Sequence, residues 1–498
     1  MEEFDYVVVG GGTAGCVIAA RLTQDRDARV LLLEAGDAAR NRALTVPDAW
    51  PGLLGSPADW RESTTPQADA GRLPYPRGRT LGGSGAINAM AHIRGHRSVY
   101  DSWPAGWRYD DLLPYFRRSE NASGRGPAVR GMSGPVRVGP VPASERNPVA
   151  RAFADGLASV GCPVTDDLSG RRQEGICWPD LAITRGHRVS PADAYLGPAL
   201  GRPNLSIRTG CLITRLLISH GRCTGVSYRR DGLACDVAAS GEVIVCAGAI
   251  GSPKLLMLSG VGPARQLRAH GISLVADVLA VGQNLRDHPA VMVCYETGSP
   301  TPRSRYNHGE VYAAVRSHAA GRWPDLHLFP ILLPIAPVRH RAPDAGYAIT
   351  ASVVAPDSRG TVRLASADPL AAPLIDPGFL REGRDLERLV AGVGLIRRAA
   401  AGGSLSGTEM HPGVAIGSDG ASLRGYIRRA VGSYFHPAGT CRIGDGENAV
   451  VDGQLRVRGV DSLRIADASV MPLIPNAPLN ATVLAIAEKA ASLIGETR

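Results

Sequence analysis

Apolar and polar residues alternate in three successive patterns at the start of the chain. The run "FDYVVVG" (4–10) is short and β-branched and predicts a strand. The next run, "GGTAGCVIAARLTQ" (11–24), has apolar residues at helical spacing. "ARVLLLEAG" (28–36) is nearly all apolar, as expected for a strand buried on both faces. Strand, helix and strand in this order predict a βαβ unit.

Later parts of the chain predict more strands and one long helix. β-Like runs occupy 204–219, 223–232 and 242–253. The segment "GYAITASVVAPDSRGTVRLAS" (346–366) predicts antiparallel strands with a turn at "DSRG" (357–360). The chain closes with a strand and turn in "LRIADASVMP" and an apolar helix in "NATVLAIAEKAASLIG". We therefore expect the N-terminal unit to be discontinuous, with its last strand supplied from the C-terminus.

The loop of the βαβ unit carries the pattern G-x-G-x-x-G at Gly10, Gly12 and Gly15. The first glycine permits a tight turn, the second allows close approach of a pyrophosphate, and the third allows helix–strand packing. Glu34 ends the second strand, where an acid binds ribose hydroxyls. The pattern predicts an adenine-dinucleotide site. Its expected binding residues are Gly10, Gly12, Thr13, Ala14, Gly15, Glu34 and Ala35.

Composition removes several other classes of function. The chain has 498 residues, 20% of them charged, and a net charge of +9 carried almost wholly by scattered arginines. Nucleic-acid binders cluster their basic residues, so we expect no nucleic-acid partner. No stretch reaches the ~20 apolar residues of a membrane span, and the N-terminus lacks signal-peptide character, which predicts a cytoplasmic protein without a membrane partner. The 9 cysteines contain no CxxC and predict neither disulfides nor a metal site.

Three further segments resemble a known family. They are "GRTLGGSGAIN" (78–88), "GAIGSPKLLMLSGVG" (248–262) and "HPAGTCRIG" (436–444), the last followed by the C-terminal strand and helix. Together with the N-terminal loop they resemble the glucose–methanol–choline family of FAD oxidoreductases over nearly the whole chain. The resemblance implies that the dinucleotide is FAD and that the chain is an enzyme acting on CH–OH donors.

The resemblance also implies an α/β fold with an α+β substrate part. A discontinuous Rossmann-like FAD domain would adjoin a second domain built on an antiparallel sheet covered by helices. The expected FAD domain comprises 1–150, 190–288 and 430–498, and the expected substrate domain comprises 151–189 and 289–429. The last part, 430–498, would carry the catalytic residues.

Further FAD-binding residues follow from the resemblance alone. They are Gly82, Gly83, Asn88, Ala89, Met90, Ala91, Ile213, Asp467, Ala468 and Asn480. Some family members tether FAD through a histidine just before the asparagine of the 78–88 loop. Here that position is Ile87, which has no nucleophilic atom, so we expect noncovalent FAD.

His436 stands in "GSYFHPAGTCRIG" (432–444), which fits neither a helix face nor an alternating strand. Oxidation of an alcohol by hydride transfer needs a base for the hydroxyl proton, and an imidazole is neutral and basic near pH 7. The resemblance places such a histidine over the flavin and pairs it with an asparagine or second histidine, here Asn480. We expect His436 to be the base and Asn480 to donate a hydrogen bond to the substrate oxygen. Asn480 also suits the N-cap of the helix that follows it.

The predicted activity is oxidation of a small primary or aromatic alcohol to the aldehyde, with O2 as acceptor. A dehydrogenase with another electron acceptor stays open, as does a hydroxynitrile-lyase-like enzyme with structural FAD or a non-catalytic FAD-binding protein. The substrate, acceptor, pathway and oligomeric state, monomer or homodimer, are not set by these residues.

Other histidines and one acid receive lesser roles. His288 in "QNLRDHP" is expected to be structural, and His92 and His308 are open candidates for the pocket wall. Glu310 falls near the position where choline-oxidising members keep a glutamate, but we interpret it as a surface residue.

Overall fold

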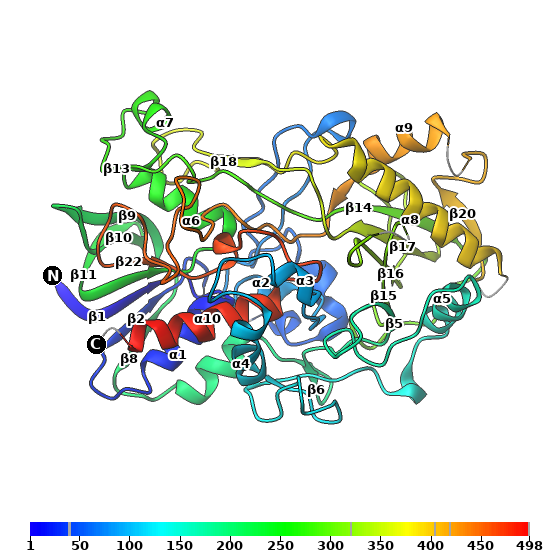
Figure 1. The fold of residues 1–498 in the computed structure, drawn as a ribbon, viewed down its shortest axis with the longest axis horizontal. Coiled ribbons are helices and arrows are strands. Elements are labelled where there is room, and N and C mark those ends of the chain that lie inside the picture. Colours follow the sequence, from blue (N-terminus) through cyan, green and yellow to red (C-terminus); the bar gives the residue numbers. More distant parts are fainter. Residues whose placement is uncertain (38–40, 319–320, 403–404, 418–419, 497–498) are drawn as a thin grey trace.

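Two seven-stranded sheets organise the chain, one toward each end of the molecule (Figure 1). The computed structural model describes residues 1–37, 41–318, 321–402, 405–417 and 420–496. The N-terminus and the helix α10 (Asn480–Gly495) near the C-terminal end lie beside the first sheet. Loops and short helices of the segment that follows the βαβ unit occupy the middle of the molecule. The fold is the predicted α/β arrangement of a Rossmann-like unit and a second, antiparallel unit.

The first sheet has the strand order β8-β2-β1-β11-β10-β9, with β22 also paired to β11. Neighbours from β8 to β11 are parallel, and β22 is parallel to the last residues of β11. The C-terminal strand therefore completes this sheet, as the sequence predicts. The strands are β1 (Glu2–Val9), β2 (Val30–Leu33), β8 (Leu205–Arg208), β9 (Leu212–Ser219), β10 (Arg222–Arg230), β11 (Leu233–Val245) and β22 (Leu463–Ile465).

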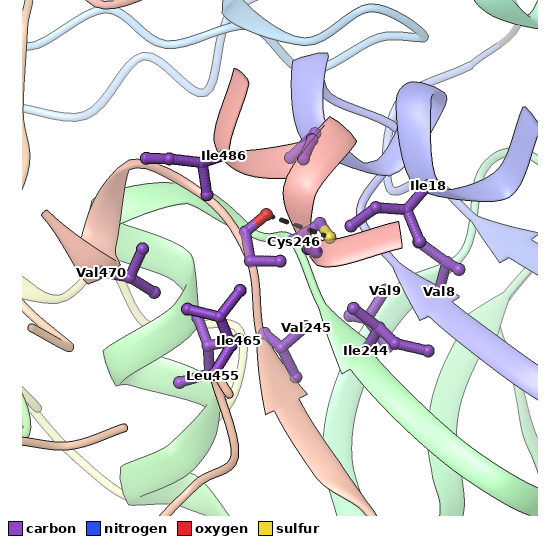
Figure 2. Packing of buried hydrophobic residues seen from close by; sticks show 14 of the residues in the cluster. Val8, Val9, Ile18, Ile244, Val245, Cys246, Leu455, Ile465, Val470 and Ile486 are labelled. Atoms are coloured by element: carbon purple, nitrogen blue, oxygen red, sulfur yellow. Dashed lines mark hydrogen bonds between the residues drawn. The ribbon is translucent and has the colours of Figure 1, made fainter. Parts of the chain in front are cut away.

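Apolar side chains fix the helices α1 (Thr13–Leu22) and α10 (Asn480–Gly495) against this sheet. The two helices pack together, and α4 (Tyr109–Ser119) packs on α10. Figure 2 shows the shared core: valines of β1 and β11 meet isoleucines of α1, β22 and α10. Burial at this density explains why the βαβ sequence is so uniformly apolar.

The second sheet is antiparallel, in the order β20-β14-β17-β16-β15-β5, with β21 also paired to β14. Helix α8 (Gly383–Ala401) lies against it, and α5 (Pro148–Ser159) and α9 (Ala421–Ala430) pack on α8. The strands are β5 (Gly175–Cys177), β14 (Pro289–Glu296), β15 (Tyr312–Val315), β16 (Leu326–Ile331), β17 (Gly346–Val353), β20 (Thr408–His411) and β21 (Gly432–Ser433).

The segment 346–366 forms antiparallel strands on both sides of 357–360, as predicted, but these two strands do not pair with each other. Strand β17 lies between β14 and β16, so both of its edges are already paired. The following strand β18 (Thr361–Arg363) pairs instead with β19 (Leu374–Asp376) in a separate small sheet. All eight residues of β17 are buried, so the alternation in its sequence does not correspond to one buried and one exposed face.

The remaining elements connect the two sheets. The other α-helices are α2 (Ser84–Ile87), α3 (Arg97–Tyr100), α6 (Gly248–Leu258) and α7 (Ala264–Ala269). The remaining two-stranded sheets join β3 (Glu120–Asn121) to β4 (Val136–Arg137), β6 (Ile183–Thr184) to β7 (His187–Arg188) and β12 (Val261–Gly262) to β13 (Ala276–Asp277). All nine cysteines are free, and all but Cys162 and Cys235 are buried. In the described part of the chain, no helix has both the length and the hydropathy that crossing a bilayer requires.

Between β21 and β22 the chain passes from the second sheet to the first. The segment that includes His436 follows β21 directly, and Asn480 begins α10 on the first sheet. The two predicted catalytic residues are therefore held by different halves of the fold. The domain boundaries at 150, 189, 288 and 429 stay predictions.

Candidate active site

A cavity of about 390 Å³ extends from the first sheet to the second. Its wall comes from the glycine-rich turn, the 83–91 loop, the start of α6, five strands of the second sheet and the segments around His436 and Asn480. We call it the inner cavity. It brings together parts of the chain that are separated by more than four hundred residues, as the resemblance implies for an FAD site.

The turn between β1 and α1 opens the N-terminus of α1 into the inner cavity. Gly10 has φ +100°, and a Cβ there would lie 2.6 Å from the Cys246 carbonyl oxygen. A Cβ on Gly15 would lie 1.9 Å from the Gly10 carbonyl oxygen, so this glycine serves the packing of the turn. A Cβ on Gly12 would come no closer than 3.9 Å to the Gly83 Cα and 4.0 Å to the Cys246 carbonyl oxygen, and this leaves room for a ligand. The free N–H groups of a helix start favour an anion such as pyrophosphate.

Glu34 ends β2 as a buried carboxylate on the wall of the inner cavity. Its Oε2 accepts a hydrogen bond from the Gly11 N–H (2.7 Å) and its Oε1 accepts one from the Gly36 N–H (2.7 Å). Burial outweighs these bonds and raises the pKa of Glu34 to about 7. Hydroxyl donors of a ribose would stabilise the ionised form further.

Fifteen predicted FAD residues line the inner cavity, whereas Gly15 and Gly82 do not. Gly82 has φ +87°, its N–H donates to the Gly11 carbonyl oxygen (2.8 Å), and a Cβ there would lie 3.0 Å from the Ala86 Cβ. Both glycines therefore support the loops that form the wall. The lining set is Gly10, Gly12, Thr13, Ala14, Glu34, Ala35, Gly83, Asn88, Ala89, Met90, Ala91, Ile213, Asp467, Ala468 and Asn480.

The loop after α2 is held in place from outside the cavity. Buried Arg188 donates from Nη1 to the Asn88 backbone oxygen (2.6 Å) and to its Oδ1 (2.9 Å). The Asn88 Oδ1 also accepts from the Met90 N–H (2.9 Å), and Met90 itself has φ +57°. A non-glycine residue held at positive φ is typical of a functional loop whose surroundings determine its shape.

Asp467 lies at the other side of the expected cofactor path, just after β22. Its carboxylate accepts from the Gly248 N–H (2.9 Å), the Ser252 Oγ (2.6 Å) and the Ser469 N–H (2.7 Å). Burial nevertheless raises its pKa. The residue ties the start of α6 to the C-terminal segment and fixes this part of the wall.

The imidazole of His436 lines the inner cavity near the second sheet. Desolvation by the surrounding chain, followed by the charge of nearby His327, lowers its pKa to about 3. Its backbone N–H donates to the Asp287 Oδ1 (2.9 Å), and the preceding Phe435 has φ +64°. Asp287 thus fixes the strained backbone that presents the ring.

A second histidine contacts the first. The Nδ1 atoms of His288 and His436 lie 3.0 Å apart, so one of them donates a hydrogen bond and the other accepts it. His288 is fully buried, its pKa is lowered by desolvation, and its Nε2 has no hydrogen-bond partner. Its backbone N–H donates to the same Asp287 carboxylate (2.7 Å). His327 of β16 adds a third buried ring, whose pKa desolvation lowers to about 4.

Asn480 is the first residue of α10 rather than its N-cap. Leu479 occupies the cap position, and no side chain caps the helix. The Asn480 Oδ1 instead accepts a hydrogen bond from the Thr13 Oγ1 (2.8 Å) at the start of α1. The starts of both helices therefore meet at the cavity wall. Because its oxygen is engaged, the amide offers N–H donors to a ligand.

The second sheet contributes only uncharged side chains to the inner cavity: Ala290, Met292, Tyr312, Phe329, Ile331, Thr350 and Ser433. Phe329 stacks on Tyr312 (centroids 4.9 Å apart, 14°) and on Tyr434 (4.8 Å, 22°). The ring of Tyr434 lies 4.3 Å from that of His436. An apolar, aromatic wall therefore leads to the candidate base.

The lesser candidates have other surroundings. His92 Nε2 lies 3.0 Å from the Glu120 Oε2 in a buried ion network. His92 lines neither the inner cavity nor the separate cavity described below. Glu310 is buried, which corrects its interpretation as a surface residue, and it accepts from the Asn147 N–H (2.9 Å) and the Ser304 Oγ (2.6 Å). It is not part of the inner cavity wall. His308 lines a separate cavity of about 600 Å³, which we call the outer cavity, together with Asp48, Gly52 and Leu332.

Sequence reasoning missed the role of His288 and His327 at the site. Their neighbours in the sequence gave no chemical reason to place them beside His436. The only signal was the position of "DHP" directly before β14, the strand that pairs with β21 just ahead of His436.

Comparison with known proteins identifies similar sequences over the whole chain. A family model described as GMC oxidoreductase matches residues 4–290 with its N-terminal part and 356–487 with its C-terminal part. An uncharacterized GMC-type oxidoreductase of Mycobacterium tuberculosis is 40% identical, covering 99% of each chain. The oxygen-dependent choline dehydrogenase of Photobacterium profundum is 36% identical and covers 99% of this chain and 93% of its own. Human mitochondrial choline dehydrogenase is 37% identical, with 99% and 90% covered.

Solved structures share the fold. The pyridoxine 4-oxidase from Mesorbium loti superposes with a TM-score of 0.94 at 36% identity, with 98% of each chain covered. A formate oxidase of Aspergillus oryzae, studied for the effect of a mutation on FAD modification, gives a TM-score of 0.91 at 27% identity, with 100% of this chain and 99% of that chain covered.

Proposed function

Because this chain belongs to the GMC oxidoreductase family and is therefore an FAD-dependent alcohol oxidoreductase, we propose that it oxidises a small primary or aromatic alcohol to the aldehyde, with His436 as the base and Asn480 as the donor to the substrate oxygen. The observation that carries the proposal is that His436, Asn480 and the glycine-rich turn all line one cavity.

The chain's own residues fit FAD. The open side of Gly12 and the start of α1 would receive the pyrophosphate, Glu34 would accept from the adenosine ribose, and the 83–91 loop would lie along the ring system. Bound FAD supplies the hydride acceptor for the reaction. All other chemistry at the site has to come from side chains.

His436 would take the hydroxyl proton at Nε2. For that nitrogen to be bare, the ring must carry its own proton on Nδ1 and donate it to the Nδ1 of His288, 3.0 Å away. His288 is then protonated on Nε2. When His436 becomes an imidazolium, the same bond strengthens because its donor is charged. Asn480, oriented by Thr13, would hold the alcohol oxygen as negative charge grows on it.

The cavity wall favours a neutral substrate. The second sheet presents no carboxylate to the inner cavity, and the Glu310 carboxylate is buried in bonds to Asn147 and Ser304. Two relatives are named choline dehydrogenases, but a quaternary ammonium placed against the second sheet would lose its hydration without an anion on that part of the wall. The stacked rings of Tyr312, Phe329 and Tyr434 suit an apolar or aromatic alcohol instead.

FAD is held noncovalently in this proposal. Ile87, at the position where some members carry the tethering histidine, is a buried hydrocarbon on the cavity wall. Acid precipitation should release all yellow colour into the supernatant. Colour that stays with the polypeptide would contradict a noncovalent cofactor.

Oxygen is the proposed electron acceptor. Similar proteins are named pyridoxine 4-oxidase and oxygen-dependent choline dehydrogenase, which supports this choice. A dehydrogenase that passes electrons to another acceptor is the second candidate. Stoichiometric hydrogen peroxide during turnover in air supports the oxidase, whereas turnover only with an added dye favours the dehydrogenase.

An anaerobic screen of alcohols for bleaching of the flavin near 450 nm tests the function. Small primary and aromatic alcohols should bleach the flavin, and choline should bleach it poorly. His436→Ala should keep FAD bound but slow flavin reduction by roughly 100-fold or more, since general-base catalysis contributes on that order. A His436→Ala enzyme that reduces its flavin at the wild-type rate would end the assignment of the base.

A further inference from the structure

A buried arginine lies behind the loop that lines the inner cavity. Arg188 ends β7, is only 3% exposed and is not part of the cavity wall. Its Nη1 donates to the backbone oxygen and to the Oδ1 of Asn88, while its Nε and Nη2 have no hydrogen-bond partner. Every side-chain hydrogen bond of Arg188 within the described chain therefore goes to one residue, and that residue lines the inner cavity.

The charge of Arg188 is not paired. Among the residues that the structure describes, no carboxylate accepts a hydrogen bond from it. The charge of Asp193 favours the ionised arginine, but the Asp193 Oδ2 accepts from the Ser190 N–H (2.9 Å) and Oγ (2.6 Å) instead. Burial lowers the pKa of Arg188 to about 10, so the side chain is still a cation at neutral pH. A buried cation without a bonded anion is costly, so negative charge brought by a ligand would stabilise it.

The contact with Arg188 determines which end of the Asn88 amide is free. The Asn88 Oδ1 accepts from the Arg188 Nη1 (2.9 Å) and from the Met90 N–H (2.9 Å). Because both partners are donors, the atom that they share is the amide oxygen. The Nδ2 group has no acceptor among the described residues, and Asn88 is only half-buried on the cavity wall. Its N–H groups are left for a ligand, and a cation bonded to the oxygen makes them stronger donors.

We propose that Arg188 is a positioning residue that turns the amide N–H groups of Asn88 toward the ring system of bound FAD and, through this amide, stabilises negative charge on the reduced ring. The proposal rests on the proposed function only for the placement of the ring along the 83–91 loop. A flavin ring is neutral when oxidised and carries one negative charge after it receives a hydride. A cation behind the loop therefore favours the reduced form, and burial leaves this interaction weakly screened.

Sulfite binding and the midpoint potential measure this effect without an alcohol. Sulfite donates its electron pair to N5 of the oxidised flavin, forms an S–N bond and leaves the ring negatively charged. Arg188→Met removes the cation and its hydrogen bonds but keeps a long, unbranched side chain. In the FAD-loaded variant we expect the dissociation constant of sulfite to rise by about tenfold or more, because hydrogen bonds to charged groups are stronger than neutral ones by roughly this factor. The midpoint potential should fall by about 30 mV for each tenfold change in the equilibrium constant of two-electron reduction.

Arg202 provides a matched control. Its Nη1 also donates to one backbone oxygen, that of Ala20 (2.6 Å), and to one side-chain oxygen, the Thr23 Oγ1 (2.9 Å). Neither Arg202 nor these two partners line the inner cavity. Arg202→Met should therefore keep the wild-type sulfite affinity and midpoint potential. Equal losses in Arg202→Met and Arg188→Met would show an effect of overall charge and would contradict the proposal.

A double variant tests whether Arg188 acts through Asn88. Asn88→Ala should itself weaken sulfite binding, and adding Arg188→Met should change the dissociation constant by less than about twofold, because the donor that Arg188 orients is already absent. Losses that multiply in the double variant would mean that the two residues act independently, and the proposal would be wrong.

Arg188→Gln serves if Arg188→Met does not hold FAD. Its amide can still donate to the Asn88 oxygen but carries no charge, so sulfite binding should weaken by about threefold or more. Wild-type sulfite affinity in either Arg188 variant, at equal flavin content, would overturn the proposal. A wild-type flavin that no alcohol reduces, together with the expected sulfite shifts, would refute the proposed substrate and leave the role of Arg188 intact.

Discussion

At the residue scale, His436 can act as a base only if its Nδ1 carries the ring proton. The contact with the Nδ1 of His288 provides the acceptor that fixes this tautomer. In a serine hydrolase triad a carboxylate performs the corresponding task. Here the carboxylate, Asp287, bonds to the backbone N–H groups of both histidines, and a neutral imidazole meets the ring. The base therefore stays uncharged in its resting state.

Two substitutions of His288 distinguish its hydrogen bond to His436 from the space that its ring fills. His288→Leu should lower the limiting rate of flavin reduction by about 10- to 100-fold, because the tautomer of His436 is no longer fixed. His288→Asn, whose carbonyl oxygen can still accept, should recover most of the rate. Stopped-flow reduction with bound FAD measured for both variants checks this. Equal losses in the two variants would mean that His288 only fills space.

Glu34 makes cofactor affinity depend on pH. Without FAD its pKa is raised from the ordinary 4.5 to about 7, so the buried group is largely protonated below that pH. Ribose hydroxyls would favour the ionised form, so FAD should bind more tightly as pH rises from about 5.5 to 8, by up to tenfold per pH unit. Glu34→Gln should abolish this trend. Equilibrium titration of apoprotein with FAD measures it, and a parallel trend in Glu34→Gln would exclude Glu34 as its source.

At the element scale, the β1–α1 turn uses its glycines for different purposes. The Cβ of an alanine at 15 would clash with the Gly10 carbonyl oxygen at 1.9 Å, whereas at 12 its nearest neighbour would be the Gly83 Cα at 3.9 Å. The conformation of Gly12, φ −74° and ψ −166°, is open to alanine. One glycine therefore shapes the turn and the other leaves space beside it.

These two positions allow folding and cofactor binding to be separated. Gly15→Ala should destabilise the apoprotein by about 1–3 kcal/mol, as overpacking does. Gly12→Ala should leave the melting temperature of the apoprotein unchanged but weaken FAD binding more than tenfold, because its methyl group occupies the approach of the pyrophosphate. Thermal unfolding and FAD titration of both apoproteins distinguish them. A Gly12→Ala protein that binds FAD normally would place the pyrophosphate elsewhere.

The elements that the sequence predicted best are those with strong local patterns. The βαβ unit, the strands within 204–219 and 223–232, and the C-terminal strand and helix lie where their patterns indicated. The prediction for 242–253 was wrong in its second half: the strand ends at Val245, and Gly248–Leu258 form α6. The strands on either side of 357–360 are present, but they do not pair with each other, because pairing partners are set by the whole sheet and not by a turn sequence. Asn480 failed as an N-cap because Thr13, distant in sequence, engages its side chain.

The candidate site divides in the same way. Residues of the glycine-rich turn were accessible from spacing alone, and the remaining cofactor positions came from family resemblance. Neither source placed His288 beside His436 or buried Glu310, because both outcomes depend on the tertiary packing of β14 and β15 with distant loops. Nor did local sequence show that Gly82 faces away from the cavity.

At the scale of the whole molecule, three neutral histidines lie where the two halves of the fold meet. His288, His327 and His436 all have lowered pKa values, about 4 for His327 and about 3 for His436. Below the ordinary pKa of about 6.5 the unfolded chain binds protons that the native protein does not bind. The free energy of unfolding therefore decreases as the pH is lowered. Buried Glu34 and Asp287 have raised pKa values and act in the opposite direction.

Removal of one histidine should reveal this balance. His327→Phe should gain stability relative to wild type as pH falls from about 6.5 to 4, by up to about 1.4 kcal/mol per pH unit for one proton. Melting temperatures of both proteins across that range, with FAD in excess, give the difference. Curves that stay parallel would show that His327 takes up its proton in the native protein too.

Between β21 and β22 the chain joins the second sheet to the first, so the proposed reaction depends on this connection. His436, the proposed base, lies just after β21 at the start of this passage, and Asn480, the proposed donor, follows β22. A cut within the exposed residues 445–448 would leave the proton acceptor on one fragment and its partner on the other. Neither fragment would hold a complete catalytic pair, so restored turnover would report their reassembly.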